Sequence, residues 1–124
     1  MKDLFDVHCH MVPGVDDGAS DLEESLAMLK MEYRDGVRNI IVTPHYRRRM
    51  FETPAKKVHE QFQKLQEAAK KEYPDLSLYL GCELHSNMDL QEILEKRKYV
   101  TMAGSSYVLQ IGRASCRERV FWVV

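Results

Sequence analysis

The sequence lacks a surplus of charge of either sign. Its 124 residues include 18 lysines and arginines and 19 aspartates and glutamates, so the net charge is close to zero. A nearly neutral chain generates no long-range field that would attract nucleic acid or an anionic membrane surface. Binding specificity must therefore come from a local site. We expect neither a nucleic-acid partner nor insertion into a membrane.

Long apolar runs and paired cysteines are also scarce. No apolar segment approaches the roughly 18 residues of a membrane-spanning helix. Asp3 and Asp6 lie at the start of the chain, where a signal peptide would have its apolar core. The three cysteines are an odd number, which argues against a secreted disulfide framework. We therefore expect a single cytoplasmic domain with free thiols.

Hydrophobic spacing predicts strands that alternate with helices. A capping box at Ser20 and Glu23 predicts the start of a helix that ends at Gly36. Its apolar stripe would consist of Leu22, Leu26, Leu29 and Tyr33. A second helix is predicted over residues 54–72, a third over 90–97, and strands over 4–7, 40–42, 76–80 and 107–109. This order is typical of parallel α/β folds with right-handed crossovers, but it does not separate an open sheet from a barrel.

Metal-competent side chains follow the predicted strands at their carboxyl ends, the edge where sites assemble in α/β proteins. His8 and His10 end the first strand, His45 follows the second and Glu83 follows the third. Residues two apart on a strand point to the same side, so the first two histidines can bind one ion while Cys9 faces away. Mixed imidazole and carboxylate ligands suit manganese, iron or zinc, and several carboxylates can bridge two or three ions.

Each candidate ligand also has an ordinary structural explanation. Two loop histidines can simply accept and donate hydrogen bonds, and a carboxylate such as Glu83 can be merely solvated after an apolar strand. The sequence D-D-G at 16–18 is common turn chemistry. This leaves Asp16 open between a turn and a ligand, whereas we favour Asp17 as a ligand.

Arg47 and Arg48 belong to a run of three arginines that begins two residues after His45. Such a run is usually a solvated patch, and three arginines are too few for a nucleic-acid footprint. If the site acts on phosphate, a guanidinium group is the best geometric match for a phosphoryl group. Arg47 and Arg48 are therefore candidates for binding a substrate phosphate.

The segments DVHCHMVPGVDDGASDLEESLAML, GVRNIIVTPHY and LGCEL resemble the polymerase and histidinol phosphatase (PHP) superfamily. Within it, the chain is most similar to the bacterial tyrosine-protein phosphatases of capsular and exopolysaccharide synthesis, from Phe5 to about Leu109. The resemblance implies a distorted, mostly parallel β/α barrel with two or three metal ions, commonly manganese. It assigns the metal ligands to His8, His10, Asp17, His45 and Glu83.

The same resemblance implies metal-assisted hydrolysis of phosphotyrosine on a protein, typically the tyrosine-rich tail of a partner kinase that controls polysaccharide assembly. Two alternatives stay open, a histidinol-phosphate phosphatase for small phosphomonoesters and an inactive metal-binding fragment. A cysteine phosphatase would need an arginine six positions after its thiol. The three corresponding positions hold Val15, Met88 and Trp122.

The chain departs from the family towards its end. A β/α barrel typically needs about 250 residues, and a further ligand glutamate, an H-P motif and a D-x-H motif of the relatives are missing. Half a barrel leaves strand edges unpaired and an apolar interior open, which keeps the inactive fragment among the alternatives. The segment IGRASCRERV at 111–120 matches the translation of a common sequencing adapter. We expect 1–110 to be the N-terminal part of a PHP phosphatase domain and 111–124 to be a non-native tail, with a native divergent tail as the alternative.

Overall fold

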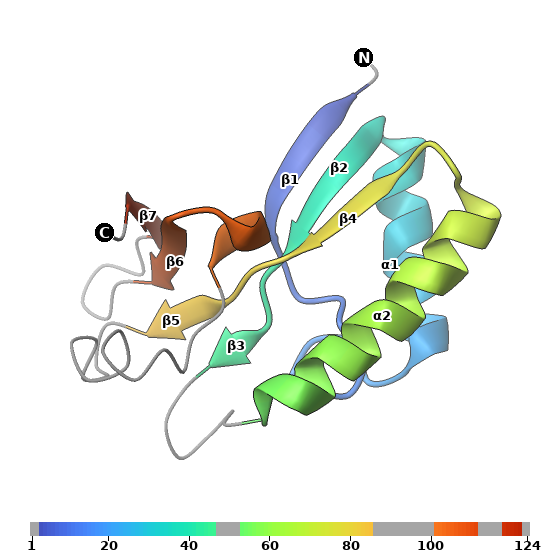
Figure 1. The fold of residues 1–124 in the computed structure, drawn as a ribbon. Coiled ribbons are helices and arrows are strands. Elements are labelled where there is room, and N and C mark those ends of the chain that lie inside the picture. The colour runs from blue at the N-terminus through green and yellow to red at the C-terminus, as the bar shows by residue number, and fades with distance from the viewer. Residues whose placement is uncertain (1–2, 47–52, 86–100, 112–117, 123–124) are drawn as a thin grey trace.

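The computed structural model of the chain describes residues 3–46, 53–85, 101–111 and 118–122 (Figure 1). Strands and helices alternate along its first half. The elements are β1 (Leu4–Cys9), α1 (Leu22–Arg34), β2 (Val37–Val42), β3 (His45–Tyr46), α2 (Ala55–Glu72), β4 (Ser77–Leu80), β5 (Glu83–His85), η1 (Met102–Gly104), β6 (Tyr107–Ile111) and β7 (Glu118–Trp122).

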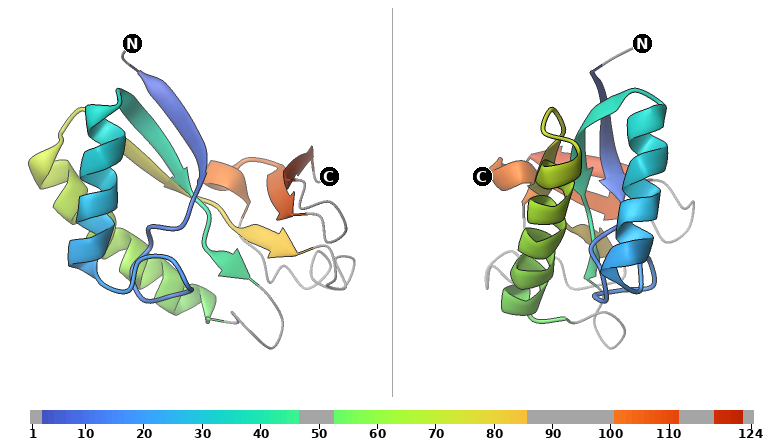
Figure 2. Two further views of the ribbon diagram at one scale, coloured as in Figure 1. Left: turned by 180° about the vertical axis from the view of Figure 1, so that it is seen from behind. Right: turned by 90° about the vertical axis from the view of Figure 1, so that its right-hand side faces the viewer.

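The first sheet has the order β1-β2-β4, with all three strands parallel. Both helices lie on the same face of this sheet (Figure 2). The main hydrophobic core fills the space between them and includes Leu29 of α1, Leu65 of α2 and Ile40 of β2, each fully buried. The predicted stripe of the second helix is confirmed, because its four members are buried: Val58, Phe62, Leu65 and Ala69.

The second sheet has the order β3-β5-β6-β7 and continues two strands of the first. The chain passes from β2 into β3 and from β4 into β5 with only two residues between the strands in each case. Backbone hydrogen bonds span these bends, since the amide of Gly81 donates to Val42 O at 2.8 Å and the amide of Glu83 donates to Pro44 O at 3.0 Å. The carboxyl ends of β1, β2 and β4 therefore meet the second sheet at one junction (Figure 1).

The mixed α/β architecture with parallel strands confirms the coarse fold class. Among the described strand pairs, β6 with β7 is the one antiparallel pair. Three strands were not predicted, namely β3, β5 and β7. The second and third strands were expected to end before His45 and Glu83, whereas the chain resumes pairing at both residues. The third predicted helix, at 90–97, lies outside the described residues.

The predicted start of the first helix is wrong by one residue. Asp21 is the N-cap, and its carboxylate accepts a hydrogen bond from the amide of Glu24 at 2.8 Å. The Ser20 hydroxyl instead donates to the Glu24 side chain at 2.6 Å. The predicted stripe also differs, because Leu22 is 37% exposed while Ser25 is buried and donates to Met11 O. Serine and aspartate are equally good caps, so the sequence alone does not choose between them.

Within the described ranges, neither helix combines the length and the apolar character needed to cross a bilayer.

Candidate metal centre

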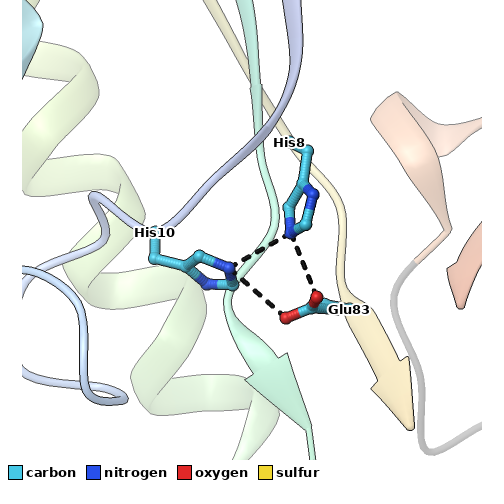
Figure 3. A group of neighbouring side chains, drawn as sticks. All are labelled: His8, His10 and Glu83. Carbon is cyan, nitrogen blue, oxygen red and sulfur yellow. Dashed lines mark hydrogen bonds and ion pairs between the residues drawn. The ribbon is translucent and has the colours of Figure 1, made fainter. Parts of the chain in front are cut away.

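His8, in β1, and His10, directly after it, point to the same side of the chain, whereas Cys9 between them points to the other side. Cys9 is buried in the main core, with its Sγ 3.9 Å from Ile41 O. His8 and His10 lie on the other side, and their Nε2 atoms are 3.2 Å apart (Figure 3). The predicted alternation of side chains is therefore confirmed.

Glu83, the first residue of β5, lies opposite both histidines. Its Oε1 is 3.1 Å from His8 Nε2 and its Oε2 is 3.3 Å from His10 Nε2 (Figure 3). The side chain is only 1% exposed. A carboxylate so deeply buried needs compensating positive charge or metal coordination.

His45, the first residue of β3, completes the surroundings of Glu83. Its Nδ1 lies 2.6 Å from Glu83 Oε2, and its ring stacks on that of His10 with centroids 4.2 Å apart. None of the contacts to Glu83 Oε2 has the geometry of a hydrogen bond, so this buried oxygen accepts none from the described residues. This oxygen therefore lies beside two imidazole nitrogens, at 3.3 Å from His10 Nε2 and 2.6 Å from His45 Nδ1, without a hydrogen-bond partner in the described part of the chain.

The electrostatics of the centre favour an ionised carboxylate. Burial alone raises the pKa of Glu83, but the contact with His45 and the charges of the three histidines outweigh burial and bring the pKa below its usual value. Burial lowers the pKa of His45, but the Glu83 carboxylate, together with the smaller effects of Asp16 and Asp17, outweighs burial and brings the pKa above its usual value. Each partner thus stabilises the charged form of the other.

The loop after β1 brings two further carboxylates to the centre. Its Gly18 packs so tightly on His10 that a Cβ there would lie 2.1 Å from His10 O. The side chain of Asp16 is 1% exposed, and its Oδ2 lies 3.3 Å from His10 Nδ1. Asp17 is 66% exposed and places its Oδ1 3.4 Å from His45 Nε2. The loop therefore contributes one buried and one accessible carboxylate.

The donor set fits a divalent cation. Ligand atoms of two trios lie within 4.8 Å of one another: those of His8, His10 and Glu83, and those of His10, Asp16 and His45. Imidazole nitrogens with carboxylate oxygens are ligands for zinc, iron and manganese. The orphaned Oε2 of Glu83 is the atom that a cation would satisfy.

The structure brings five of the predicted site residues to one place: His8, His10, Asp17, His45 and Glu83. Arg47 and Arg48 lie outside the described residues. The sequence left the role of Asp16 open between a turn residue and a metal ligand. Its side chain proves to be the more buried of the two aspartates. The signal for it was present, since the Gly18 amide donates to Asp16 Oδ1 in the local turn that D-x-G favours.

Comparison with protein families gives one match over most of the chain. The family described as "Capsular polysaccharide synthesis, CpsB/CapC" matches residues 4–114. The tyrosine-protein phosphatase CpsB of Streptococcus pneumoniae is 43% identical over 106 residues, which are 86% of this chain and 44% of that protein. The tyrosine-protein phosphatase YwqE of Bacillus subtilis is 31% identical over 106 residues, 86% of this chain and 42% of that protein.

A solved structure supports the same relationship. It is described as "Crystal structures of YwqE from Bacillus subtilis and CpsB from Streptococcus pneumoniae, unique metal-dependent tyrosine phosphatases". It superposes with a TM-score of 0.78 at 30% sequence identity and covers 89% of this chain and 44% of the matched chain. The chain thus spans less than half the length of the relatives that it matches.

Proposed function

Because the chain belongs to the capsular polysaccharide synthesis CpsB/CapC family, we propose that it is the N-terminal part of a metal-dependent protein-tyrosine phosphatase. The observation that carries the proposal is the buried Glu83 carboxylate, which faces His8, His10 and His45 at the junction of the two sheets. Such a constellation has little use in a purely structural core, because a buried charge costs stability unless it is compensated.

In this proposal His8, His10, His45, Glu83 and Asp17 hold two or three divalent cations, with manganese preferred and iron or zinc as alternatives. The cations would supply an activated water nucleophile and neutralise charge on the phosphoryl oxygens. Asp17 lies on the exposed side of the centre and Glu83 on the buried side. A phosphoester would therefore approach from the side of Asp17.

The state of Cys9 supports a reaction without a phosphocysteine. Burial, with a smaller effect from nearby carboxylates, raises the pKa of this thiol far above its ordinary value. A thiol that stays protonated and is packed in the core is a poor nucleophile.

Finer features of the proposal come from the family resemblance. The substrate is a phosphotyrosine-bearing protein, with the tyrosine-rich tail of a bacterial kinase as the candidate. The parallel strands, with both helices on one face of the first sheet, support a distorted β/α barrel as the complete fold. The free thiol of Cys9 is in keeping with the cytoplasm, where thiols stay reduced.

We further propose that residues 1–110 belong to the phosphatase domain and that 111–124 are a non-native tail. The antiparallel pairing of β7 with β6 is in keeping with this division, since the described strand pairs within 1–110 are parallel. The genomic sequence after Gln110 tests it. A continuation with the ligand glutamate, H-P and D-x-H motifs would support the division, and a continuation identical to 111–124 would overturn it.

Hydrolysis assays on the chain completed by its genomic continuation after Gln110 test the activity. We expect Mn²⁺-dependent release of phosphate from a phosphotyrosine peptide, abolished by His8→Ala and by chelation of the metal. His59→Ala is the matched control, because His59 is exposed on α2 and does not belong to the metal centre. Circular dichroism would establish that both variants remain folded.

Two outcomes would contradict the proposal. Faster turnover of histidinol phosphate than of the phosphotyrosine peptide would favour a small-molecule phosphatase. Mn²⁺ binding by the completed protein without hydrolysis of either substrate would contradict a phosphatase, whereas the same result for the 124-residue chain alone would make that chain an inactive metal-binding fragment.

A further inference from the structure

We propose that Asp16 is a positioning residue, which orients His10 and His45 for a cation without binding the cation itself. The inference rests on the proposed function only in taking the centre to be a metal site. Asp16 and Asp17 are neighbours in the chain, and their surroundings assign them different tasks.

The oxygens of Asp16 are already occupied by protein donors. Its Oδ1 accepts a hydrogen bond from the Gly18 amide at 2.9 Å. Its Oδ2 accepts one from the His45 amide at 2.9 Å and lies 3.3 Å from His10 Nδ1. A carboxylate offers about four acceptor positions, so three donors leave little capacity for a cation. With 1% of the side chain exposed, water does not reach the carboxylate to replace these donors.

The contact with His10 selects which ring nitrogen carries the proton. An ionised carboxylate only accepts, so His10 Nδ1 must be the donor. An imidazole that binds a cation is neutral, so its lone pair then lies on His10 Nε2, which is 3.2 Å from His8 Nε2 and 3.3 Å from Glu83 Oε2. This is the arrangement in which a carboxylate beside a metal-binding histidine fixes its tautomer and ring orientation.

The hydrogen bond to the His45 amide extends this control to a second strand. It links the loop after β1 to the first residue of β3, which are 29 positions apart in the chain. The His45 ring stacks on the His10 ring with an interplanar angle of 13°. One carboxylate therefore holds the ring of one histidine and the backbone of the other, and the two rings support each other.

Asp17 has none of these restraints from the residues that the structure describes. Its side chain is 66% exposed. Its contact with His45 Nε2, at 3.4 Å, is longer than the two hydrogen bonds that Asp16 accepts from backbone amides. Its oxygens are free to turn towards a cation. The difference between the two aspartates follows from the turn. The hydrogen bond from the Gly18 amide holds the Asp16 side chain inward, and the Asp17 side chain is left facing solvent.

Asp16→Asn is the sharpest perturbation, because it keeps the shape and removes one acceptor. An amide in that place must present its NH₂ either to the Gly18 amide or to the His45 amide, and both are donors. We expect Mn²⁺ to bind about 10- to 100-fold more weakly, the usual effect of removing such a partner. Asp35→Asn is the matched control: it changes an exposed aspartate after α1, and we expect unchanged affinity.

Two measurements on metal-free and metal-loaded protein distinguish positioning from mere structural support. Nitrogen-15 NMR of the imidazoles should show His10 protonated on Nδ1 in the unaltered chain, and this preference should be lost in Asp16→Asn. Titration of the unaltered chain with diamagnetic Zn²⁺ should leave the Gly18 and His45 amides protected from solvent exchange. This second measurement needs no variant and so remains decisive if Asp16→Asn fails to fold.

The inference is overturned if Zn²⁺ releases these two amides, because Asp16 would then have left its donors to become a ligand. It is also overturned if a folded Asp16→Asn retains both the Mn²⁺ affinity and the His10 tautomer. Metal binding that depends on Asp16, in a chain that hydrolyses no phosphotyrosine, would support the inference while contradicting the proposed phosphatase activity.

Discussion

Replacing Gly18 by alanine should disturb both the stability of the chain and its metal centre. A Cβ at this position would lie 2.1 Å from His10 O and 2.6 Å from His10 Cβ, whereas unstrained carbon contacts lie near 3.5 Å or more. The loop must therefore move by about 1.4 Å. That movement weakens two hydrogen bonds, from the Gly18 amide to Asp16 and from the Ala19 amide to His10 O. Since one of them has a charged acceptor, we expect a loss of about 2 to 4 kcal/mol in the free energy of unfolding.

Urea denaturation and Mn²⁺ titration of Gly18→Ala measure the two consequences. Gly104→Ala provides the control, because Gly104 has a φ of +71° but no atom of the described residues lies within 4 Å of the added Cβ. Its cost should be that of left-handed backbone alone, about 1 to 2 kcal/mol, with no change in metal affinity. Gly18→Ala should be more destabilised than this control and should bind Mn²⁺ more weakly.

The reasoning is refuted if Gly18→Ala unfolds at the same urea concentration as the unaltered chain and binds Mn²⁺ with the same affinity. Such a result would mean that the loop can move away from His10 without losing its hydrogen bonds. A loss of stability with unchanged affinity would separate the loop packing from the metal centre and contradict the second half of the prediction.

Three further perturbations test the core and the titrating groups. Leu65→Ala, at a fully buried position of α2, should cost about 2 to 5 kcal/mol in urea denaturation; a cost below about 1 kcal/mol would contradict tight packing there. Burial, aided by Asp6, raises the pKa of Glu32 from 4.5 to about 7. Between these two values, the folded chain holds a proton on Glu32 that the unfolded chain has lost. The contribution of protonated Glu32 to stability is therefore full below about pH 4.5 and is lost as the pH rises to about 7. The stability of Glu32→Gln relative to the unaltered chain should therefore increase across this range, and a constant difference would contradict the shift. The Cys9 thiol, with its raised pKa, should resist iodoacetamide at pH about 8 until urea unfolds the chain, as peptide mass spectrometry would report.

The sequence predicts those parts of the structure that depend on local periodicity. The stripe from Val58 to Ala69 repeats at helical spacing, and the structure buries it as expected. The positions of His8, His10 and Glu83 also follow from sequence, because the carboxyl ends of parallel strands share one edge. To predict these three positions, it was enough to assign each strand and its direction.

Other features depend on contacts between distant residues and could not be predicted in this way. Asp16 and Asp17 have the same side chain in the same turn, and the amide of His45, 29 residues away, is one of the donors that hold the first of them inward. The continuation of β2 into β3 past Pro44 likewise depends on pairing with β5. A local signal marks such positions as turns, and only the assembled sheets decide which side chains enter the centre.

The junction between the two sheets makes the geometry of the centre depend on their relative orientation. His8 and His10 are carried by β1 and the residue after it, whereas His45 and Glu83 begin strands of the other sheet. A rotation of one sheet against the other would change the separations between the two pairs of side chains while leaving the separation within each pair nearly constant. The affinity for a cation consequently depends on the angle between the sheets. Substitutions at residues such as Leu84 and Val108, which pack in the core of the second sheet, can therefore alter that affinity without any contact with the ion.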